Sequence, residues 1–175
     1  PLAAMILFDF WAAFPSVAHR FLFLVLEVAG LPPELILLIR RLYTNCKHVI
    51  ARGGKLFAGP ALFSGVRQGC PLSGLLFAII TEPIIRRLCR VIGPSGTLKA
   101  YADDLGVVID NYVKHLPSLG SAFEVIGKAT GLHLNIAKTV FIPLWEVADL
   151  KQLGNNIKEL FPTWAKIQIA YAGKY

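Results

Sequence analysis

Two neighbouring carboxylates stand between two strand-like runs, and this feature limits the possible folds more than any other. The stretch "TLKAYADDLGVVID", residues 97–110, indicates a strand, a turn and a second strand, with Asp103 and Asp104 at the turn. Successive residues of a strand point to opposite faces, so both acids can share a site only where the chain turns. Strands joined by so short a connection are antiparallel. The chain is therefore expected to contain an antiparallel hairpin.

Helices and strands are predicted to alternate along the rest of the chain. Apolar residues between 70 and 91 follow helical spacing, although Pro83 is expected to kink or loosen that helix. Gly53 and Gly54 stand between two strand-like runs and predict a two-residue hairpin. The other predicted elements are helices at 16–30, 32–45, 113–130 and 146–161, and strands at 4–10, 138–144 and 165–172. This order indicates an α+β fold, and 175 residues fit one domain.

The composition is typical of a folded domain, and its net positive charge favours a negatively charged binding partner. Hydrophobic residues make up 55% of the chain and charged residues 17%, which excludes a disordered tail. Eighteen Lys and Arg against eleven Asp and Glu give a net charge of +7, which favours nucleic acid or an acidic membrane surface. The apolar run 68–81 is too short to span a bilayer, and 21–39 is interrupted by acids and prolines. No membrane span is predicted.

The cysteines and histidines do not form a recognisable metal or disulfide pattern. Cys46, Cys70 and Cys89 contain no CxxC pair, which predicts reduced intracellular thiols. The four histidines are scattered, which disfavours a zinc site. The chain begins within an apolar run, without an evident secretory signal, and is expected to be a piece of a longer protein.

Asp9 supplies a third carboxylate in an apolar setting, "MILFDFWAAF". Asp is depleted in strands, so it either turns to solvent, caps the next helix or serves a site. Two carboxylates about 4 Å apart repel by ~4 kcal/mol at an effective dielectric constant of about 20, and divalent cations reverse the sign of that interaction. Magnesium ions bridged by carboxylates are a recurrent solution for nucleotidyl transfer. For Asp103 and Asp104, a plain polar turn is the alternative.

A glycine-rich segment, "SGVRQGCPLSGLLF" at residues 64–77, precedes the first long helix. Gly65 and Gly69 permit close approach of a ligand to the backbone, and Arg67 and Gln68 offer hydrogen-bond donors. These features suit a nucleotide or a template strand. The alternative is a connecting loop with a solvated arginine.

A second polar segment, "GLHLNIAKT" at residues 131–139, follows the second long helix. It contains Asn135 and Lys138. The lysine could donate a proton or hold a phosphate, and an ordinary exposed surface lysine is the alternative.

In this order, the segments resemble the palm motifs of reverse transcriptases, and most closely those of non-LTR (LINE-type) retrotransposons. "ILFDFWAAFPSV" resembles the first motif, with Asp9 at the metal-binding aspartate and Phe14 at the aromatic position under the incoming sugar. "GVRQGCPLSGLLF" is similar to the second motif, with Gln68 at its glutamine. "AYADDLG" is similar to the Tyr-x-Asp-Asp hairpin that begins here with Tyr101. "GLHLNIAKT" resembles the fourth motif, with Lys138 at its lysine.

The resemblance implies an RNA-directed DNA polymerase whose partners are an RNA template, a DNA primer and a dNTP. The implied fold is a ferredoxin-like antiparallel palm sheet with packed helices. Residues 1–175 are then a partial palm domain that lacks most of the fingers and thumb of a longer parent protein. The implied catalytic residues are Asp9, Asp103, Asp104 and Lys138, and the three acids hold two Mg²⁺ ions, which Mn²⁺ can replace. The implied nucleotide and template contacts are Phe14, Arg67, Gln68, Gly69, Tyr101 and Asn135.

A decayed, non-catalytic retroelement remnant is the alternative. Pro15 stands where the family usually has a second Asp, and Gly74 replaces the usual Pro after Ser73. Such a remnant would at most bind nucleic acid through its positive charge. A group II intron or retron polymerase is a related alternative, but "RQGCPLS" is closer to the LINE type.

Overall fold

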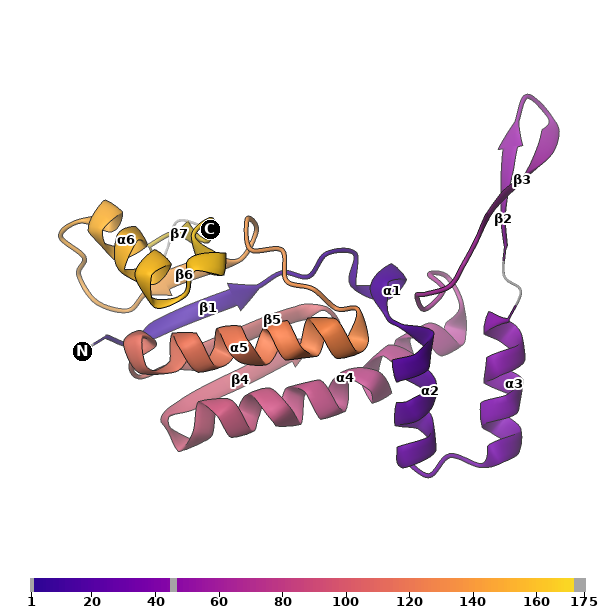
Figure 1. The fold of residues 1–175 in the computed structure, drawn as a ribbon, viewed down its shortest axis with the longest axis horizontal. Coiled ribbons are helices and arrows are strands. Elements are labelled where there is room, and N and C mark those ends of the chain that lie inside the picture. Colours follow the sequence, from indigo (N-terminus) through magenta and orange to yellow (C-terminus); the bar gives the residue numbers. More distant parts are fainter. Residues whose placement is uncertain (1, 45–46, 172–175) are drawn as a thin grey trace.

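The computed structural model describes residues 2–44 and 47–171, which form a five-stranded mixed sheet with helices packed against it and a separate two-stranded sheet (Figure 1). In chain order the elements are β1 (Ala4–Phe8), α1 (Ala13–Ser16), α2 (His19–Val28), α3 (Pro33–Tyr43), β2 (Lys47–Arg52), β3 (Lys55–Ala61), α4 (Pro71–Ile92), η1 (Gly93–Ser95), β4 (Gly96–Tyr101), β5 (Asp104–Ile109), α5 (Tyr112–Thr130), β6 (Val140–Pro143), α6 (Leu150–Leu160), η2 (Pro162–Trp164) and β7 (Gln168–Ile169). The predicted α+β class is confirmed. The predicted strand 165–172 is shortened to β7, and its last residue lies outside the described residues.

The main sheet has the strand order β4-β5-β1-β6-β7. β1 lies in the centre and pairs antiparallel with both β5 and β6. The first four of these strands, together with α4 and α5, follow the chain order β-α-β-β-α-β of a ferredoxin-like fold. The antiparallel prediction holds for all pairs except β6 with β7, which is parallel. That strand is an added edge outside the ferredoxin-like unit.

The core lies between the sheet and the two long helices, α4 and α5 (Figure 1). Alternate residues of β1 are buried, as period-two geometry requires for a strand covered on one face. β5 shows the same alternation, with Leu105, Val107 and Ile109 buried. On the uncovered face, Tyr101 of β4 is 83% exposed and Val108 of β5 is 40% exposed. One face of the sheet is therefore packed, and the other is open over β4 and β5 but not over β6, all four residues of which are buried.

The long helix α4 continues through Pro83, which lies on its exposed side. The prediction of one long helix is confirmed, and the proline does not end it. Thr81 donates hydrogen bonds to the carbonyls of Phe77 (2.9 Å) and Ala78 (3.1 Å), within the turn that precedes the proline. Threonine hydroxyls inside helices commonly bond to the carbonyl three or four residues earlier in this way.

The hairpin β2–β3 projects away from the main sheet (Figure 1). Gly53 and Gly54 form its turn with φ values of 57° and 74°. Positive φ at both central residues is what a two-residue type I′ turn requires, and this confirms the predicted hairpin. Within residues 2–44 and 47–171, no helix combines the length and apolar character needed to cross a bilayer.

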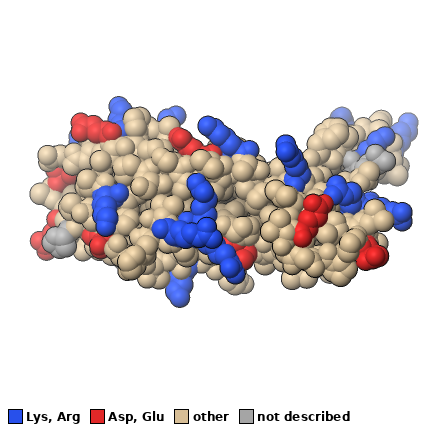
Figure 2. Space-filling model, turned by 60° about the horizontal axis from the view of Figure 1, so that its bottom comes forward, with Lys and Arg blue, Asp and Glu red and all other residues tan. Residues whose placement is uncertain are grey.

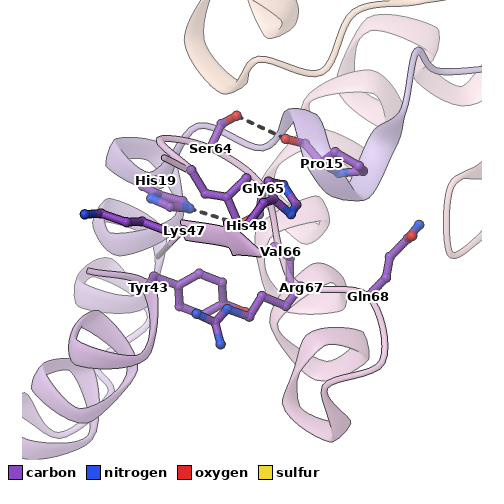
Figure 3. Close-up of a pocket in the computed structure, with 11 residues that line it drawn as sticks. Pro15, His19, Tyr43, Lys47, His48, Ser64, Gly65, Val66, Arg67 and Gln68 are labelled. Atoms are coloured by element: carbon purple, nitrogen blue, oxygen red, sulfur yellow. Dashed lines mark hydrogen bonds between the residues drawn. The ribbon is translucent and has the colours of Figure 1, made fainter. Parts of the chain in front are cut away.

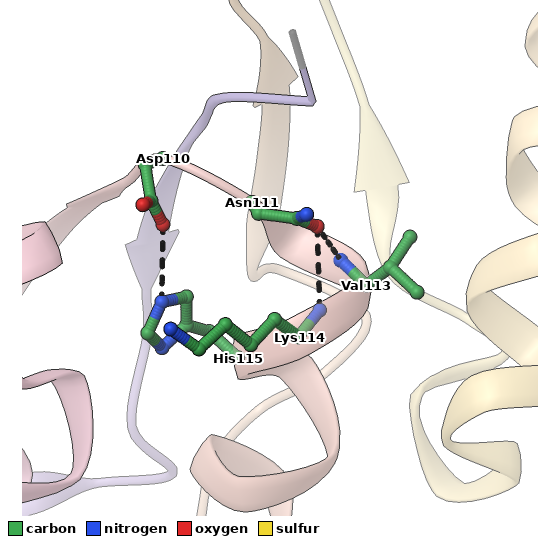
Figure 4. Close-up of polar contacts among 5 residues, drawn as sticks. All are labelled: Asp110, Asn111, Val113, Lys114 and His115. Carbon is green, nitrogen blue, oxygen red and sulfur yellow. Dashed lines mark hydrogen bonds and ion pairs between the residues drawn. The ribbon is translucent and has the colours of Figure 1, made fainter.

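The helix α5 begins at an asparagine cap (Figure 4). The side-chain oxygen of Asn111 accepts hydrogen bonds from the backbone N–H groups of Val113 (3.0 Å) and Lys114 (3.3 Å). Next to it, His115 Nε2 lies 3.1 Å from Asp110 Oδ1. The cap satisfies N–H groups that have no partner inside the helix.

Asn111→Ala is expected to lower the free energy of unfolding by about 1 kcal/mol, because it removes this cap. Urea denaturation followed by circular dichroism measures the change. Asn111→Ser keeps a capping oxygen and should remain close to the wild type. Equal stabilities of the Ala and Ser variants would show that the cap contributes nothing.

Candidate active site

The sheet brings Asp9 and the acidic pair to the same edge. β1 runs antiparallel to β5, and Phe8, its last residue, pairs with Leu105. Asp9 therefore follows β1 at the end where Asp104 begins β5. Asp103 lies in the two-residue turn between Tyr101 and Asp104, which pair with each other. The predicted turn at the acids is confirmed, and Ala102 allows it by adopting a φ of 52°.

The acids are accessible, because Asp103 and Asp104 are exposed and Asp9 is half-buried. Their carboxylate oxygens are the ligand type that Mg²⁺ prefers. In the arrangement of residues 2–44 and 47–171, however, no three His, Cys, Asp or Glu side chains lie close enough together to hold a metal ion. The fold thus supplies carboxylate donors at one edge of the sheet without gathering three of them into a metal-sized cluster among the described residues.

The segment predicted as the fourth motif is hydrogen-bonded to the backbone of Asp9. The N–H of Asn135 donates to the Asp9 carbonyl (2.8 Å), and the N–H of Asp9 donates to Thr139 Oγ1 (3.4 Å). Asn135 is buried, and its carbonyl accepts from the N–H groups of Lys138 (3.0 Å) and Thr139 (2.9 Å). This tight turn fixes the backbone of Lys138 near Asp9 and leaves its side chain exposed.

The glycine-rich loop is held against the first motif by backbone hydrogen bonds. The N–H of Gly65 donates to the Val17 carbonyl (2.7 Å), and the N–H of Val66 donates to the Phe14 carbonyl (2.7 Å). Gly65 has a φ of 93°, and a Cβ there would lie 2.7 Å from the Pro15 carbonyl oxygen. Only glycine fits this close approach.

Phe14 lies where the glycine-rich loop meets the start of α4. Its ring stacks on Phe77 of α4, with centroids 4.3 Å apart and an interplanar angle of 12°. The Ser73 hydroxyl donates to the Arg67 carbonyl and ties the loop to the start of α4. Phe14 is half-buried, so part of its ring remains available at the surface.

A groove of about 390 Å³ lies on the open face of the sheet and leads to the acidic edge. Met5 and Leu7 of β1 and Tyr101 of β4 line it, together with Lys99 and Asp104. Apolar and aromatic side chains therefore lead along this groove to Asp104.

Not all predicted site residues lie in this groove. Arg67 and Gln68 line a separate pocket of about 540 Å³ between α2, α3, β2 and the glycine-rich loop (Figure 3). His19, Tyr43 and Lys47 also line it, and the sequence analysis did not single them out. Gly69, next in the loop, is exposed and has a φ of 85°.

Positive charge is spread over one face of the molecule (Figure 2). On the face that Figure 2 shows, Lys and Arg side chains stand in several separate groups, with Asp and Glu side chains among them. Dispersed positive charge of this kind attracts a polyanion without specifying one binding track.

Comparison with known proteins identifies the family. The family described as reverse transcriptase (RNA-dependent DNA polymerase) matches residues 3–157. The chain belongs to the reverse transcriptase family. It is 30% identical over 135 residues to the transposon TX1 uncharacterized 149 kDa protein of Xenopus laevis, a match that covers 73% of this chain and 10% of the relative.

Further relatives agree with a reverse transcriptase of the non-LTR retrotransposon type. The retrovirus-related Pol polyprotein from type-1 retrotransposable element R2 of Bradysia coprophila is 29% identical over 144 residues, covering 78% of this chain and 16% of that protein. The non-LTR prediction is confirmed. The chain thus spans a small part of the length of these two curated relatives.

Solved structures confirm the palm-type fold of this reverse transcriptase fragment. Apo telomerase from Candida tropicalis, truncated from its C-terminal domain, matches with a TM-score of 0.70 and 17% identity, covering 85% of this chain and 32% of that one. A second structure of apo telomerase from the same organism matches with a TM-score of 0.66 and 14% identity, covering 95% of this chain and 39% of that one. At these identities the likeness concerns the fold alone.

Proposed function

We propose that residues 1–175 form the partial palm of an RNA-directed DNA polymerase that adds dNTPs to a primer 3′-hydroxyl on an RNA template. One observation carries the proposal: Asp9 and the pair Asp103–Asp104 come from separate segments and meet at one sheet edge, beside an open groove. A plain hairpin turn accounts for the pair, but it does not account for an acid at the adjoining strand end.

The acids are the residues that would hold Mg²⁺ or Mn²⁺. Bound there, the metal would supply Lewis-acid chemistry, which neutralises triphosphate charge and activates a hydroxyl nucleophile. Asp9 is suited to this role because its backbone is fixed on both sides by Asn135 and Thr139. Preorganised ligands need less reordering when a cation binds.

The other residues of the proposal position the substrates. Phe14, stacked on Phe77 and half-buried, would contact the sugar of the incoming dNTP. Lys138 can protonate the leaving pyrophosphate from the turn anchored at Asp9. Tyr101 lies in the groove and provides a surface for a base or sugar of the primer–template duplex.

The proposal is tested by primer extension in a longer chain that carries this palm together with fingers and thumb. An RNA template, a labelled DNA primer, dNTPs and magnesium are supplied, and products are separated on a gel. Extension that depends on all four dNTPs is the expected result. No extension under any magnesium or manganese concentration would contradict the proposal and favour a non-catalytic remnant.

A further inference from the structure

The pocket between α2, α3, β2 and the glycine-rich loop has a uniform charge character (Figure 3). Lys47 and Arg67 bring cationic groups to it, and His19 and His48 bring imidazoles. None of the described residues that line it is an Asp or Glu. Its volume of about 540 Å³ falls in the range of sites that bind nucleotide-sized ligands.

Tyr43 supplies an independent observation. The residue is only 5% exposed, lines the pocket, and has a hydroxyl without a hydrogen-bond partner among the described residues. Buried polar atoms are nearly always paired, so this hydroxyl keeps a donor that a group bound beside it could use. A hydroxyl donates readily to an anionic oxygen.

The surroundings of Tyr43 hold its ring in place. His19 packs edge-on against it, with centroids 5.4 Å apart at 70°, and His19 Nε2 lies 3.0 Å from the Gly65 carbonyl oxygen. The Arg67 guanidinium carbon lies 6.0 Å from the Tyr43 ring centroid, and Figure 3 shows the two side chains reaching toward each other. The Tyr43 hydroxyl and the Arg67 guanidinium could therefore both contact the same anionic group.

We infer that this pocket is a phosphate-binding site in which Tyr43 and Lys47 act with Arg67. Arginine and a phenolic hydroxyl suit the oxygens of a phosphate, and lysine adds a point charge at the pocket rim. The phosphate can belong to the backbone of a single-stranded nucleic acid or to a free polyphosphate such as that of a nucleotide. The inference extends the proposed function, because it assigns residues that are separate from the acidic edge.

The test measures binding to the chain without metal or primer. Fluorescence anisotropy follows a labelled single-stranded RNA oligonucleotide, and tripolyphosphate is titrated separately by calorimetry. Tyr43→Phe and Lys47→Gln are each expected to weaken binding about tenfold, the loss typical of a hydrogen bond or contact to a charged group. Lys47→Gln should also reduce the slope of log K against log salt for RNA by about 0.7.

Two matched control variants show whether a loss of binding is specific to substitutions in the pocket. Tyr112→Phe alters another buried tyrosine in the core beside the sheet, and Lys158→Gln alters an exposed lysine on α6. Both should bind like the wild type. Weaker RNA binding by the pocket variants alone assigns the site to a nucleic acid backbone, and weaker tripolyphosphate binding alone assigns it to a free polyphosphate.

Unchanged binding of both probes in Tyr43→Phe and Lys47→Gln would overturn the inference, as would equal losses in the controls. A measurement on the wild type guards against misfolded variants: the Tyr43 ring signals in NMR spectra should shift on titration with at least one probe. Absence of that shift at saturation contradicts the site. Because no metal or primer is present, failure here is distinguishable from failure of primer extension.

Discussion

Replacing Asp103 or Asp104 with alanine, in a longer chain that carries fingers and thumb, is expected to reduce primer extension about a thousandfold or more. Each acid is proposed to hold metal that stabilises transition-state charge, an effect of several kcal/mol, and every ~1.4 kcal/mol changes the rate tenfold. Gel-based rates of single-nucleotide addition on an RNA template measure the loss. Binding of the primer–template should change little, because both side chains are exposed.

Asp110→Ala is the matched control for these variants. Asp110 is also an exposed aspartate beside β5, but it follows the opposite end of the strand, where it contacts His115 and lies away from the acidic edge. It should retain nearly full extension activity. If Asp103→Ala and Asp104→Ala extended primers as fast as Asp110→Ala, the acidic edge would have no catalytic role.

Gly131→Ala is expected to lower the free energy of unfolding by about 3–5 kcal/mol, near the upper end for single substitutions. Gly131 ends α5 with a φ of 81°, a conformation that L-residues adopt at a cost of about 1–2 kcal/mol. A Cβ there would also collide with the Ser16 carbonyl oxygen. The neighbouring hydrogen bond from the Ala18 N–H to the Thr130 carbonyl (2.8 Å) holds the two segments close. Denaturant unfolding measures the loss.

Gly30→Ala separates backbone strain from collision. Gly30 has a similar φ of 74°, but a Cβ there would meet nothing within 4 Å. This variant should lose only about 1–2 kcal/mol, the cost of the left-handed conformation itself. If Gly131→Ala lowered the free energy of unfolding no more than Gly30→Ala does, the collision with the Ser16 carbonyl oxygen would contribute nothing to the loss.

Much of the fold could be predicted from the sequence because the elements carry strong local patterns. The spacing of apolar residues marked α4 and α5, the pair Gly53–Gly54 marked the β2–β3 turn, and Gly131 marked the end of α5. The parallel pairing of β7 with β6 could not be predicted, because a two-residue strand has too few side chains to show a pattern.

The acids of the candidate site could be predicted because aspartate is unusual in the apolar, strand-forming segments where they stand. Asp9 beside a buried strand and the paired acids at a turn are unusual enough to be noticed. The anchoring of Lys138 next to Asp9 depends on backbone hydrogen bonds between segments more than 120 residues apart, which no local pattern encodes. The position of Tyr43 in a pocket wall could not be predicted, because an aromatic residue on the buried face of a helix usually belongs to the hydrophobic core.

The most direct test of the account is to locate manganese on the chain by paramagnetic broadening of NMR signals. Mn²⁺ is added below one equivalent to the wild type, to Asp104→Ala and to Asp110→Ala. The account predicts that amide signals of Asp9, Asp103 and Lys138 broaden together in the wild type and in Asp110→Ala, and that this broadening is largely lost in Asp104→Ala. Broadening at other acids only, or an equal effect in all three proteins, would contradict a shared metal site at this sheet edge.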